Sequence, residues 1–545
     1  MGQAIASGIF NLTGGAALQA GAAILLSYLL AGATALCCAA VMAEFARELP
    51  ISGAGFTWTI TTLGELPAMF VLGNTLAGQV LGNAAVSRGF SYFLAQLCGR
   101  PPTFFNVGSS SVNPVAFGIN VVITLLVATG VRESAFFITG LTLLHLLMLS
   151  IVMVAGFTQA NPANLQPFFS GGADNCIDAA GILFFTFIGM EAPAVGAEEA
   201  HTPSQLPAAI IGNASVAVLV YFFMALSLLM MVPAAEVGTP AVPVSAAEYR
   251  ANAFTAAFSA AGLGHWNSFV LVTAMLGTLT SLVTLMYSCS RIVMVGARDR
   301  LLPPQLSRVS KRTQTPAMAQ LLVGAIISII SLLTSTASLQ RFTVICYIVT
   351  YFVIANAMMV RRYLPGGSRL RCSSFMTVEA GPTIHGSSGC LTWLAARRSI
   401  PWRRALFLLH LAALNGLSIA AATVFQTVTF QPARASPGDT ASPPFSSWLA
   451  VVVLLGGWAA ATLSLQLWVP LEYEPTWHIP RLMMPWVPSF ALLLIPLALS
   501  SLPGDAWVHY AVWCGILAAF YLLYSLPASY LRHYAPDWQN KEELK

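Results

Sequence analysis

Apolar stretches long enough to cross a lipid bilayer follow one another through almost the whole sequence. A spanning helix needs about 20 apolar residues to cross about 30 Å of hydrocarbon. Fourteen such stretches lie near residues 3–19, 21–43, 66–98, 114–131, 136–157, 179–198, 207–233, 266–290, 316–336, 341–360, 404–426, 446–468, 482–500 and 506–529. The runs are continuous rather than alternating, which predicts helices, because a helix bonds its backbone polar groups internally. The sequence therefore predicts an all-α polytopic membrane protein with about 14 transmembrane helices.

The composition excludes several other classes of protein. Hydrophobic residues make up 57% of the 545 residues and charged residues only 8%, whereas soluble domains average about 25% charged residues. This balance excludes a soluble enzyme, a disordered protein and a nucleic-acid binder. The nine cysteines have no paired or metal-ligand spacing, and no nucleophile–base–acid set is present. We therefore expect no enzymatic activity, no cofactor and no metal site.

Basic residues gather in the loops after even-numbered predicted helices. The loops after the eighth and tenth helices contain most of the 25 Lys and Arg residues, namely Arg291, Arg298, Arg300, Arg308, Lys311, Arg312, Arg361, Arg362, Arg369, Arg371, Arg397, Arg398, Arg403 and Arg404. Because cytoplasmic loops collect Lys and Arg, we expect these loops and the C-terminus to be cytoplasmic. The plasma membrane is the expected location, with the vacuolar membrane as the alternative.

Two predicted helices are interrupted in mid-membrane. The first contains IASGIFNLTGG at residues 5–15, and the sixth contains FFTFIGMEAPAVGAEEA at residues 184–200. Glycine and proline also occur in membrane helices for ordinary packing. However, these two interruptions open successive sets of five helices, and paired interruptions of this kind are the best sequence indication of a transporter site built on inverted repeats.

Several motifs resemble those of a known superfamily, in the same order along the chain. They include MGQAIASGIFNLTGGAAL, VLGNAAVSRGFS, FTFIGMEAPAVGAEEAHTP and SRIVMVGARDRLLP. Together they resemble the amino acid–polyamine–organocation superfamily, and more narrowly its cationic amino acid transporter family. The C-terminal segments MMPWVPSFALLLIPLAL and WVHYAVWCGILAAFYLLYSL resemble the two extra helices that take that family from twelve helices to fourteen.

The resemblance implies a LeuT-like fold of two inverted five-helix repeats followed by four C-terminal helices. The expected divisions are helices 1–5 at residues 1–157, helices 6–10 at 158–360, a cytoplasmic loop at 361–403, and helices 11–14 with a cytoplasmic tail at 404–545. Only about five residues precede the first interruption, so we expect that the first half-helix is truncated and that the natural chain begins earlier.

The resemblance also implies a substrate site between helices 1 and 6. The implied substrate-binding residues are Ile5, Ser7, Gly8, Ile9, Phe184, Phe185, Phe187 and Glu191. Backbone N–H groups of residues 7–9 would bind the substrate carboxylate. Carbonyl groups near Ile5 and in the sixth helix would bind its amino group, and Phe185 would cap the substrate as a gate.

An ionisable residue lies in the middle of the fifth predicted helix. His145 stands where many superfamily members have a lysine, and Thr280 and Ser281 match hydroxyl groups that the family places nearby. Intramembrane ionisable groups are functional candidates by default, and histidine exchanges protons near neutral pH. We expect His145, Thr280 and Ser281 to form a coupling site, although a neutral, structural His145 remains the alternative.

Acidic residues follow the interruption of the sixth helix. Glu191 is a second candidate for protonation coupled to transport, with a structural role as its alternative. Glu198 and Glu199 lie at the predicted cytoplasmic end of this helix, and we expect them to form an inner gate with Arg291 and Arg298.

The sequence departs from the family at two informative positions. Gly78 stands where the family has a glutamate that accompanies cationic substrates, and Ala6 replaces the first glycine of the helix 1 motif. A buried guanidinium needs a compensating charge, so the change at Gly78 weakens the prediction of a cationic substrate. Glu191 is the remaining acid that would supply this charge.

We therefore expect a secondary active transporter that moves cationic amino acids, arginine and lysine, by alternating access, with protons as the candidate coupled ion. A neutral amino acid permease, or a sensor that binds amino acids without efficient turnover, is the alternative. The expected partners are the substrate and the lipid bilayer, with no nucleic acid and no required protein partner. Cys98 and Cys176 fall on the predicted outer side, where a disulfide, a bond to a partner and free thiols all remain open.

Overall fold

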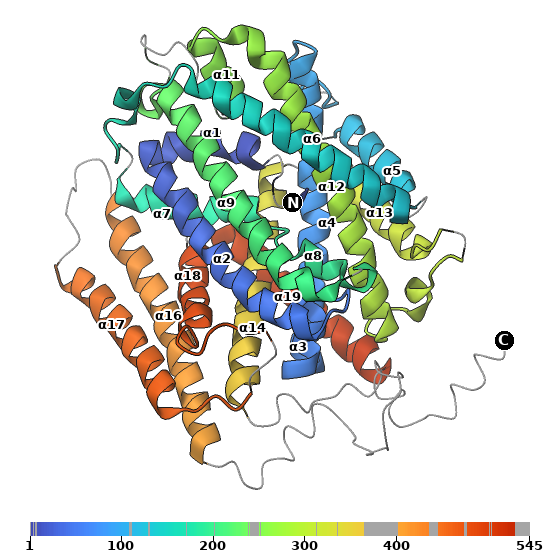
Figure 1. Cartoon of the computed structure of the whole chain (residues 1–545), viewed down its shortest axis with the longest axis vertical. Coiled ribbons are helices and arrows are strands. Elements are labelled where there is room, and N and C mark those ends of the chain that lie inside the picture. The colour runs from blue at the N-terminus through green and yellow to red at the C-terminus, as the bar shows by residue number, and fades with distance from the viewer. Residues whose placement is uncertain are drawn as a thin grey trace.

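The regular elements in the described part of the chain are helices that form one bundle (Figure 1). The computed structural model describes residues 2–3, 5, 8–107, 112–128, 131–170, 172–200, 202–237, 239, 250, 252–311, 313–334, 336–364, 402–434, 445–473, 477–500, 502 and 504–528. The prediction of an all-α polytopic membrane protein is confirmed. The predicted cytoplasmic loop at 361–403 lies mostly outside the described residues.

The helices follow the predicted apolar stretches closely. The longer ones are α1 Gly8–Ala20, α2 Ile24–Glu48, α3 Gly55–Leu63, α4 Glu65–Leu97, α5 Pro114–Ala128, α6 Val131–Phe157, α7 Ala173–Leu183, α9 Leu206–Met231, α11 Ala253–Ala260, α12 Asn267–Arg298, α13 Ala317–Leu333, α14 Thr336–Tyr363, α16 Trp402–Arg434, α17 Phe445–Trp468, α18 Trp486–Ser500 and α19 Gly504–Phe520. In the described residues, ten helical segments are long and apolar enough to cross a membrane, and α5, α13 and α18 are shorter apolar helices. The total of fourteen spans stays a prediction.

The first of these segments, Gly8–Glu48, contains both α1 and α2. A straight helix of its 41 residues would be about 60 Å long, twice the thickness of the hydrocarbon core. Gly21 breaks it, because its φ of +63° does not continue a right-handed helix. Figure 1 shows α1 and α2 running in different directions on either side of this point.

Replacing Gly21 by alanine should destabilise the protein. A Cβ atom there would lie 1.9 Å from Ser170 Oγ, and a positive φ costs a non-glycine residue about 1–2 kcal/mol. The matched control is Gly15→Ala, since a Cβ at Gly15 in α1 meets nothing within 4 Å and alanine favours a helix. The melting temperature of the purified protein in detergent should fall for Gly21→Ala alone, and equal melting of the two variants would contradict this account.

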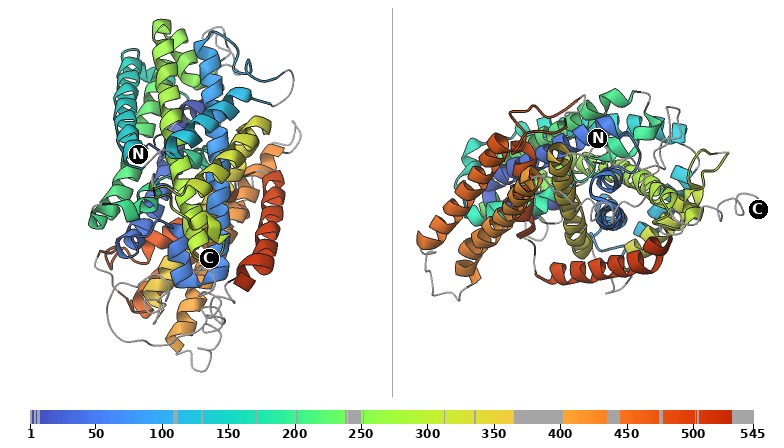
Figure 2. Two further views of the ribbon diagram at one scale, coloured as in Figure 1. Left: turned by 90° about the vertical axis from the view of Figure 1, so that its right-hand side faces the viewer. Right: turned by 90° about the horizontal axis from the view of Figure 1, so that it is seen from below.

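Helix α4 lies in the centre of the bundle. It packs against α12 and α14 along its length and also contacts α3, α5 and α13. The later helices lie around this centre: α16 and α17 form a pair at one edge, and α19 lies along another edge, beside α14 and α4 (Figure 2).

The C-terminal ends of α2 and α14 lie on the same face of the bundle. Arg361 pairs with Glu48, and Arg362 pairs with Glu44 at 3.1 Å. The segment after α17 covers these pairs: the Tyr473 hydroxyl donates to Glu48 at 2.7 Å and the Ile479 backbone N–H donates to Glu44 at 2.8 Å. This arrangement agrees with the expectation that the loops after even-numbered helices share one side, while the assignment of that side to the cytoplasm stays a prediction.

Candidate functional site

The predicted interruption of the sixth helix is an unwound segment between two short helices. Helix α7 ends at Leu183, a 3-10 turn covers Phe184–Phe187, and α8 covers only Ala192–Val195. Between them Gly189 has a φ of +103°, a conformation that glycine adopts without strain. The sequence folds this way because a glycine and a nearby proline interrupt an otherwise apolar helix.

The carbonyl groups freed by this unwinding are bonded by side chains of α9. The Tyr221 hydroxyl donates to the Thr186 carbonyl at 3.0 Å, and Asn213 Nδ2 donates to the Gly189 carbonyl at 3.4 Å. Backbone groups in a membrane interior must find such partners. Helix α9 therefore stabilises the interruption from behind and leaves its other side free to face the centre of the bundle.

The start of α1 lies directly against the interruption of the sixth helix. Helix α1 begins at Gly8, and a Cβ atom at this position would lie 2.9 Å from Thr186 Cγ2. The absence of a side chain at Gly8 thus allows the start of α1 to touch the unwound segment of the sixth helix. The N-terminal end of α1, with the partial positive charge of a helix N-terminus, lies at this contact.

A small cavity of about 30 Å³ lies beside the contact. It is lined by Gln3, Gly8, Gly78, Gly82, Val86, Phe185, Thr186, Ile188, Ser281, Leu285 and Thr343. This volume holds about two water molecules, so an amino acid enters only when the lining moves apart. The cavity combines a helix N-terminus, hydroxyl groups and apolar side chains, as expected of a site for a small amphipathic molecule.

The predicted substrate-binding residues are distributed around this cavity. Gly8 and Phe185 line it. Ile5, Ile9 and Phe187 are buried nearby, and Phe187 packs on the Tyr221 ring with centroids 5.3 Å apart. Ser7 lies outside the described residues.

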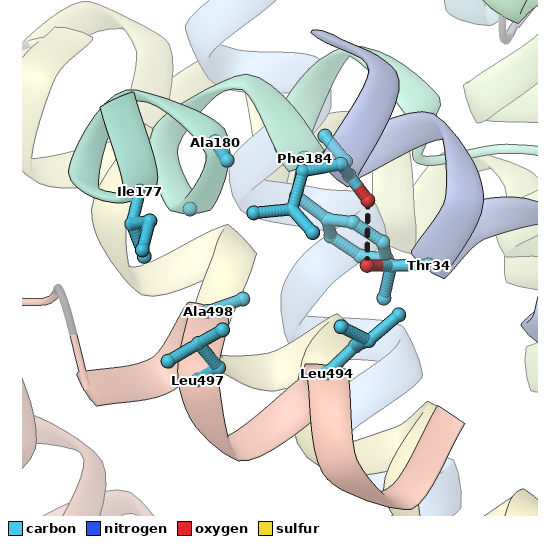
Figure 3. Close-up of a pocket in the computed structure, with 10 residues that line it drawn as sticks. Thr34, Ile177, Ala180, Phe184, Leu494, Leu497 and Ala498 are labelled. Atoms are coloured by element: carbon cyan, nitrogen blue, oxygen red, sulfur yellow. Dashed lines mark hydrogen bonds between the residues drawn. The ribbon is translucent and has the colours of Figure 1, made fainter. Parts of the chain in front are cut away.

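Phe184 lies elsewhere, in a second cavity between α2, α7 and α18 (Figure 3). That cavity is smaller, about 10 Å³, and mostly apolar. The hydroxyl of Thr34 beside it donates to the Leu30 carbonyl at 2.9 Å. The Phe184 side chain therefore does not belong to the central cavity, although its backbone is part of the unwound segment.

Glu191 is buried behind the central cavity. Its Oε2 accepts a hydrogen bond from the Tyr351 hydroxyl at 2.7 Å, whereas its Oε1 has no hydrogen-bond partner in the described part of the structure. The Tyr351 ring in turn lies beside the Tyr347 ring, with centroids 5.9 Å apart. Glu191 is thus held by α14 and does not line the cavity.

The predicted coupling residues lie on α6 and α12, close to the start of the chain. Ser281 Oγ donates to the Gly2 carbonyl at 3.2 Å, and a Cβ at Gly2 would lie 3.6 Å from Thr280 Cβ and 2.9 Å from Thr142 Oγ1. His145 follows Thr142 by one turn of α6 and is fully buried. Among the described residues neither of its ring nitrogens has a hydrogen-bond partner, which is an unusual state for a buried polar group.

The four predicted gate residues form two ion pairs between the end of the sixth helix and α12. Glu199 pairs with Arg291 at 3.1 Å and Glu198 pairs with Arg298 at 3.1 Å. The Arg291 guanidinium also lies 3.7 Å from the centroid of the Tyr287 ring, whose hydroxyl donates to Glu199 at 2.6 Å. These contacts close the bundle on the face of the α12 C-terminus, and their role as a gate stays a prediction.

Sequence reasoning missed one residue that lines the cavity and one that lies behind the lining residue Gly78. Gln3 lines it and accepts a long hydrogen bond of 3.5 Å from Ser288 of α12, while its Nε2 has no partner among the described residues. Tyr347 covers Gly78 from α14. A polar residue within the first apolar stretch was a signal for Gln3, whereas no local pattern connects Gly78 with Tyr347.

The cysteines in the described residues are free thiols, including Cys98, which is exposed, and Cys176, which is buried. The internal disulfide is therefore not found, and Cys176 is inside the bundle, where the Ser27 hydroxyl donates to its carbonyl at 2.7 Å. The bond from Cys98 to a partner stays an open alternative.

The fold and the cavity define a polytopic membrane protein in which the start of α1 faces the unwound segment of the sixth helix beside a central cavity. A family model described as amino acid permease matches residues 1–455. The chain belongs to this amino acid permease family, within the amino acid–polyamine–organocation superfamily, and the family is one of transporters rather than enzymes.

Relatives with known roles agree with this assignment. The chain is 27% identical over 541 residues to cationic amino acid transporter 1 of Arabidopsis thaliana, covering 97% of this chain and 81% of that protein. It is 25% identical over 589 residues to cationic amino acid transporter 4 of Mus musculus, covering 100% of this chain and 86% of that protein. It is 29% identical over 374 residues to a branched-chain amino acid permease of Bacillus subtilis (strain 168), covering 66% of this chain and 78% of that protein.

Proposed function

We propose that this chain transports amino acids by alternating access, with the substrate held where helices 1 and 6 are interrupted. The observation that supports this most directly is the contact between Gly8 and Thr186 beside the central cavity. There the N-terminus of α1 would bind a substrate carboxylate, since helix N-termini favour anions. Carbonyl groups of the unwound segments would bind the ammonium group, with Phe185 as the cap.

The closed cavity fits one state of such a cycle. It is too small for an amino acid, and the two ion pairs at the end of α12 lie on one side of it. In the proposed cycle these pairs break when the site opens to the cytoplasm and form again when it closes. The plasma membrane, with the vacuolar membrane as alternative, and a cytoplasmic C-terminus remain part of this proposal.

Protons are the proposed coupled ion, and His145 is the proposed carrier. It is buried in α6, which packs on α12, one turn from Thr142, which lies beside Gly2 at the start of the chain, and both of its ring nitrogens lack partners in the described structure. Adding a proton there would place a charge next to the unwound helix 1, which would bias the position of that segment. Glu191, with one unbonded oxygen, is the second candidate.

Uptake of radiolabelled amino acids into proteoliposomes tests this proposal. With an inward proton gradient, His145→Gln should lower uptake about tenfold and remove its dependence on the gradient, because glutamine does not titrate. Glu191→Gln is the corresponding variant of the second candidate. Like His145→Gln it removes a titrating group, while the glutamine Oε1 still accepts the hydrogen bond from Tyr351. Unchanged gradient dependence in His145→Gln would contradict the role of His145, and binding without uptake by the wild type would favour the sensor alternative.

A further inference from the structure

None of the described residues that line the central cavity has an ionisable side chain. Its eleven residues supply amide, hydroxyl, apolar and glycine groups. Helix α4 contributes two glycines, Gly78 and Gly82, which lie one turn apart and expose their backbone to the cavity. A substrate side chain directed at α4 would therefore meet an uncharged surface.

The space beside Gly78 is already filled by Tyr347 of α14. A Cβ atom at Gly78 would lie 2.6 Å from Tyr347 Cε2 and 2.7 Å from its Cδ2, distances at which atoms must move apart. A Cβ atom at Gly82 would lie 3.5 Å from Thr343 Cγ2, which is an ordinary contact. Position 78 therefore has no room for a side chain while the Tyr347 ring is in place, and position 82 does.

Glu191 is a buried acid that is hydrogen-bonded to an aromatic neighbour of Tyr347. It accepts a hydrogen bond from Tyr351, which lies against Tyr347, and none of these three residues is among those that line the cavity. Tyr347 itself is 1% exposed, and its hydroxyl has no hydrogen-bond partner among the described residues. The Glu191 carboxylate is thus bonded to Tyr351 and is not part of the cavity lining.

From this geometry we infer that the substrate is a neutral amino acid and that Tyr347 is the specificity-determining residue. Its ring lies behind Gly78, in the place in which a side chain at position 78 would stand, and so limits the site on the side that Gly78 lines. A guanidinium or ammonium group brought to this side would be buried without a compensating charge, which is strongly unfavourable. The inference rests on the proposed function and adds the substrate class to it.

The test measures uptake and binding of radiolabelled leucine, phenylalanine and arginine by the full chain in proteoliposomes. The wild type should prefer leucine to arginine by tenfold or more. Tyr347→Ala should admit phenylalanine better without admitting arginine, because it enlarges the site but adds no charge. The double variant Gly78→Glu/Tyr347→Ala should shift the preference at least tenfold toward arginine, since the ring is removed and an acid is added.

Two further variants serve as controls. Tyr347→Phe keeps the ring and should keep the wild-type preference, and Gly118→Ala in α5 should leave uptake unchanged, because Gly118 does not line the cavity and a Cβ there meets nothing within 4 Å. Wild-type uptake of arginine equal to that of leucine, or arginine uptake by Tyr347→Ala alone, would overturn the inference. If the wild type neither takes up nor binds any of the three amino acids, the proposed function itself is contradicted. A wild type that takes up arginine in preference to leucine contradicts only the inferred substrate class.

Discussion

Replacing Arg362 by alanine is expected to destabilise the protein by about 3–5 kcal/mol, the usual cost of removing one partner from a buried ion pair. The Arg362 side chain is 0% exposed and that of its partner Glu44 is 3% exposed. Arg362 also donates to the backbone carbonyls of Tyr473 and Ile479 at 2.9 and 3.1 Å. Its loss would therefore leave a buried carboxylate and two carbonyls without this partner. The melting temperature in detergent and the yield of monodisperse protein measure the effect.

The matched control is Arg298→Ala, which removes a basic residue from an ion pair of similar length. The side chains of Arg298 and Glu198 are 38% and 31% exposed, and exposed pairs contribute about 0–1 kcal/mol. Arg298→Ala should therefore melt close to the wild type. Equal losses of stability in the two variants would show that burial does not decide the strength of these pairs.

The second large effect is expected at the pair of Glu199 and Arg291. Arg291 is buried, with a side chain 3% exposed, whereas that of Glu199 is 37% exposed. Reversing either charge alone brings two like charges together, so the helix 6 end should no longer close against α12. Uptake in proteoliposomes should fall at least tenfold for Glu199→Arg and for Arg291→Glu.

Combining the two reversals should restore part of the uptake, because opposite charges again face each other. Recovery will be incomplete, because the double variant loses the stacking of the Arg291 guanidinium on Tyr287. In the wild type this guanidinium lies 3.7 Å from the ring centroid. A double variant as inactive as either single variant would argue against a gating role for this pair. Binding of substrate, measured in parallel, separates a closed gate from an unfolded protein.

Much of the fold could be predicted because local sequence patterns determine where the helices begin and end. Continuous apolar runs define the spans, and glycine and proline mark the interruption at Gly189 and the start of α1 at Gly8. The family assignment, predicted from motifs in order, is confirmed. The boundary between α1 and α2 was also expected, close to Gly21.

The remaining features depend on contacts between segments far apart in the chain. Nothing near Gly78 indicates that Tyr347 covers it, and nothing near Glu44 indicates that the segment around Ile479 donates a hydrogen bond to it. The side chain of Phe184 lies in the cavity of Figure 3, although its neighbour Phe185 lines the central one. Both residues lie in the 3-10 turn Phe184–Phe187, where successive side chains point about 120° apart.

The ion pairs that join α2 to α14 have a consequence for how the bundle moves. Tyr473 belongs to the same group, since burial and the hydrogen bond to Glu48 raise its pKa and keep its hydroxyl protonated as a donor. Helix α18 packs on both α2 and α14. Because buried ion pairs do not stretch without a large cost, a displacement of α2 must carry α14 and α18 with it. In the proposed alternating-access cycle, we therefore expect α18 to move together with α2 and α14 as one unit.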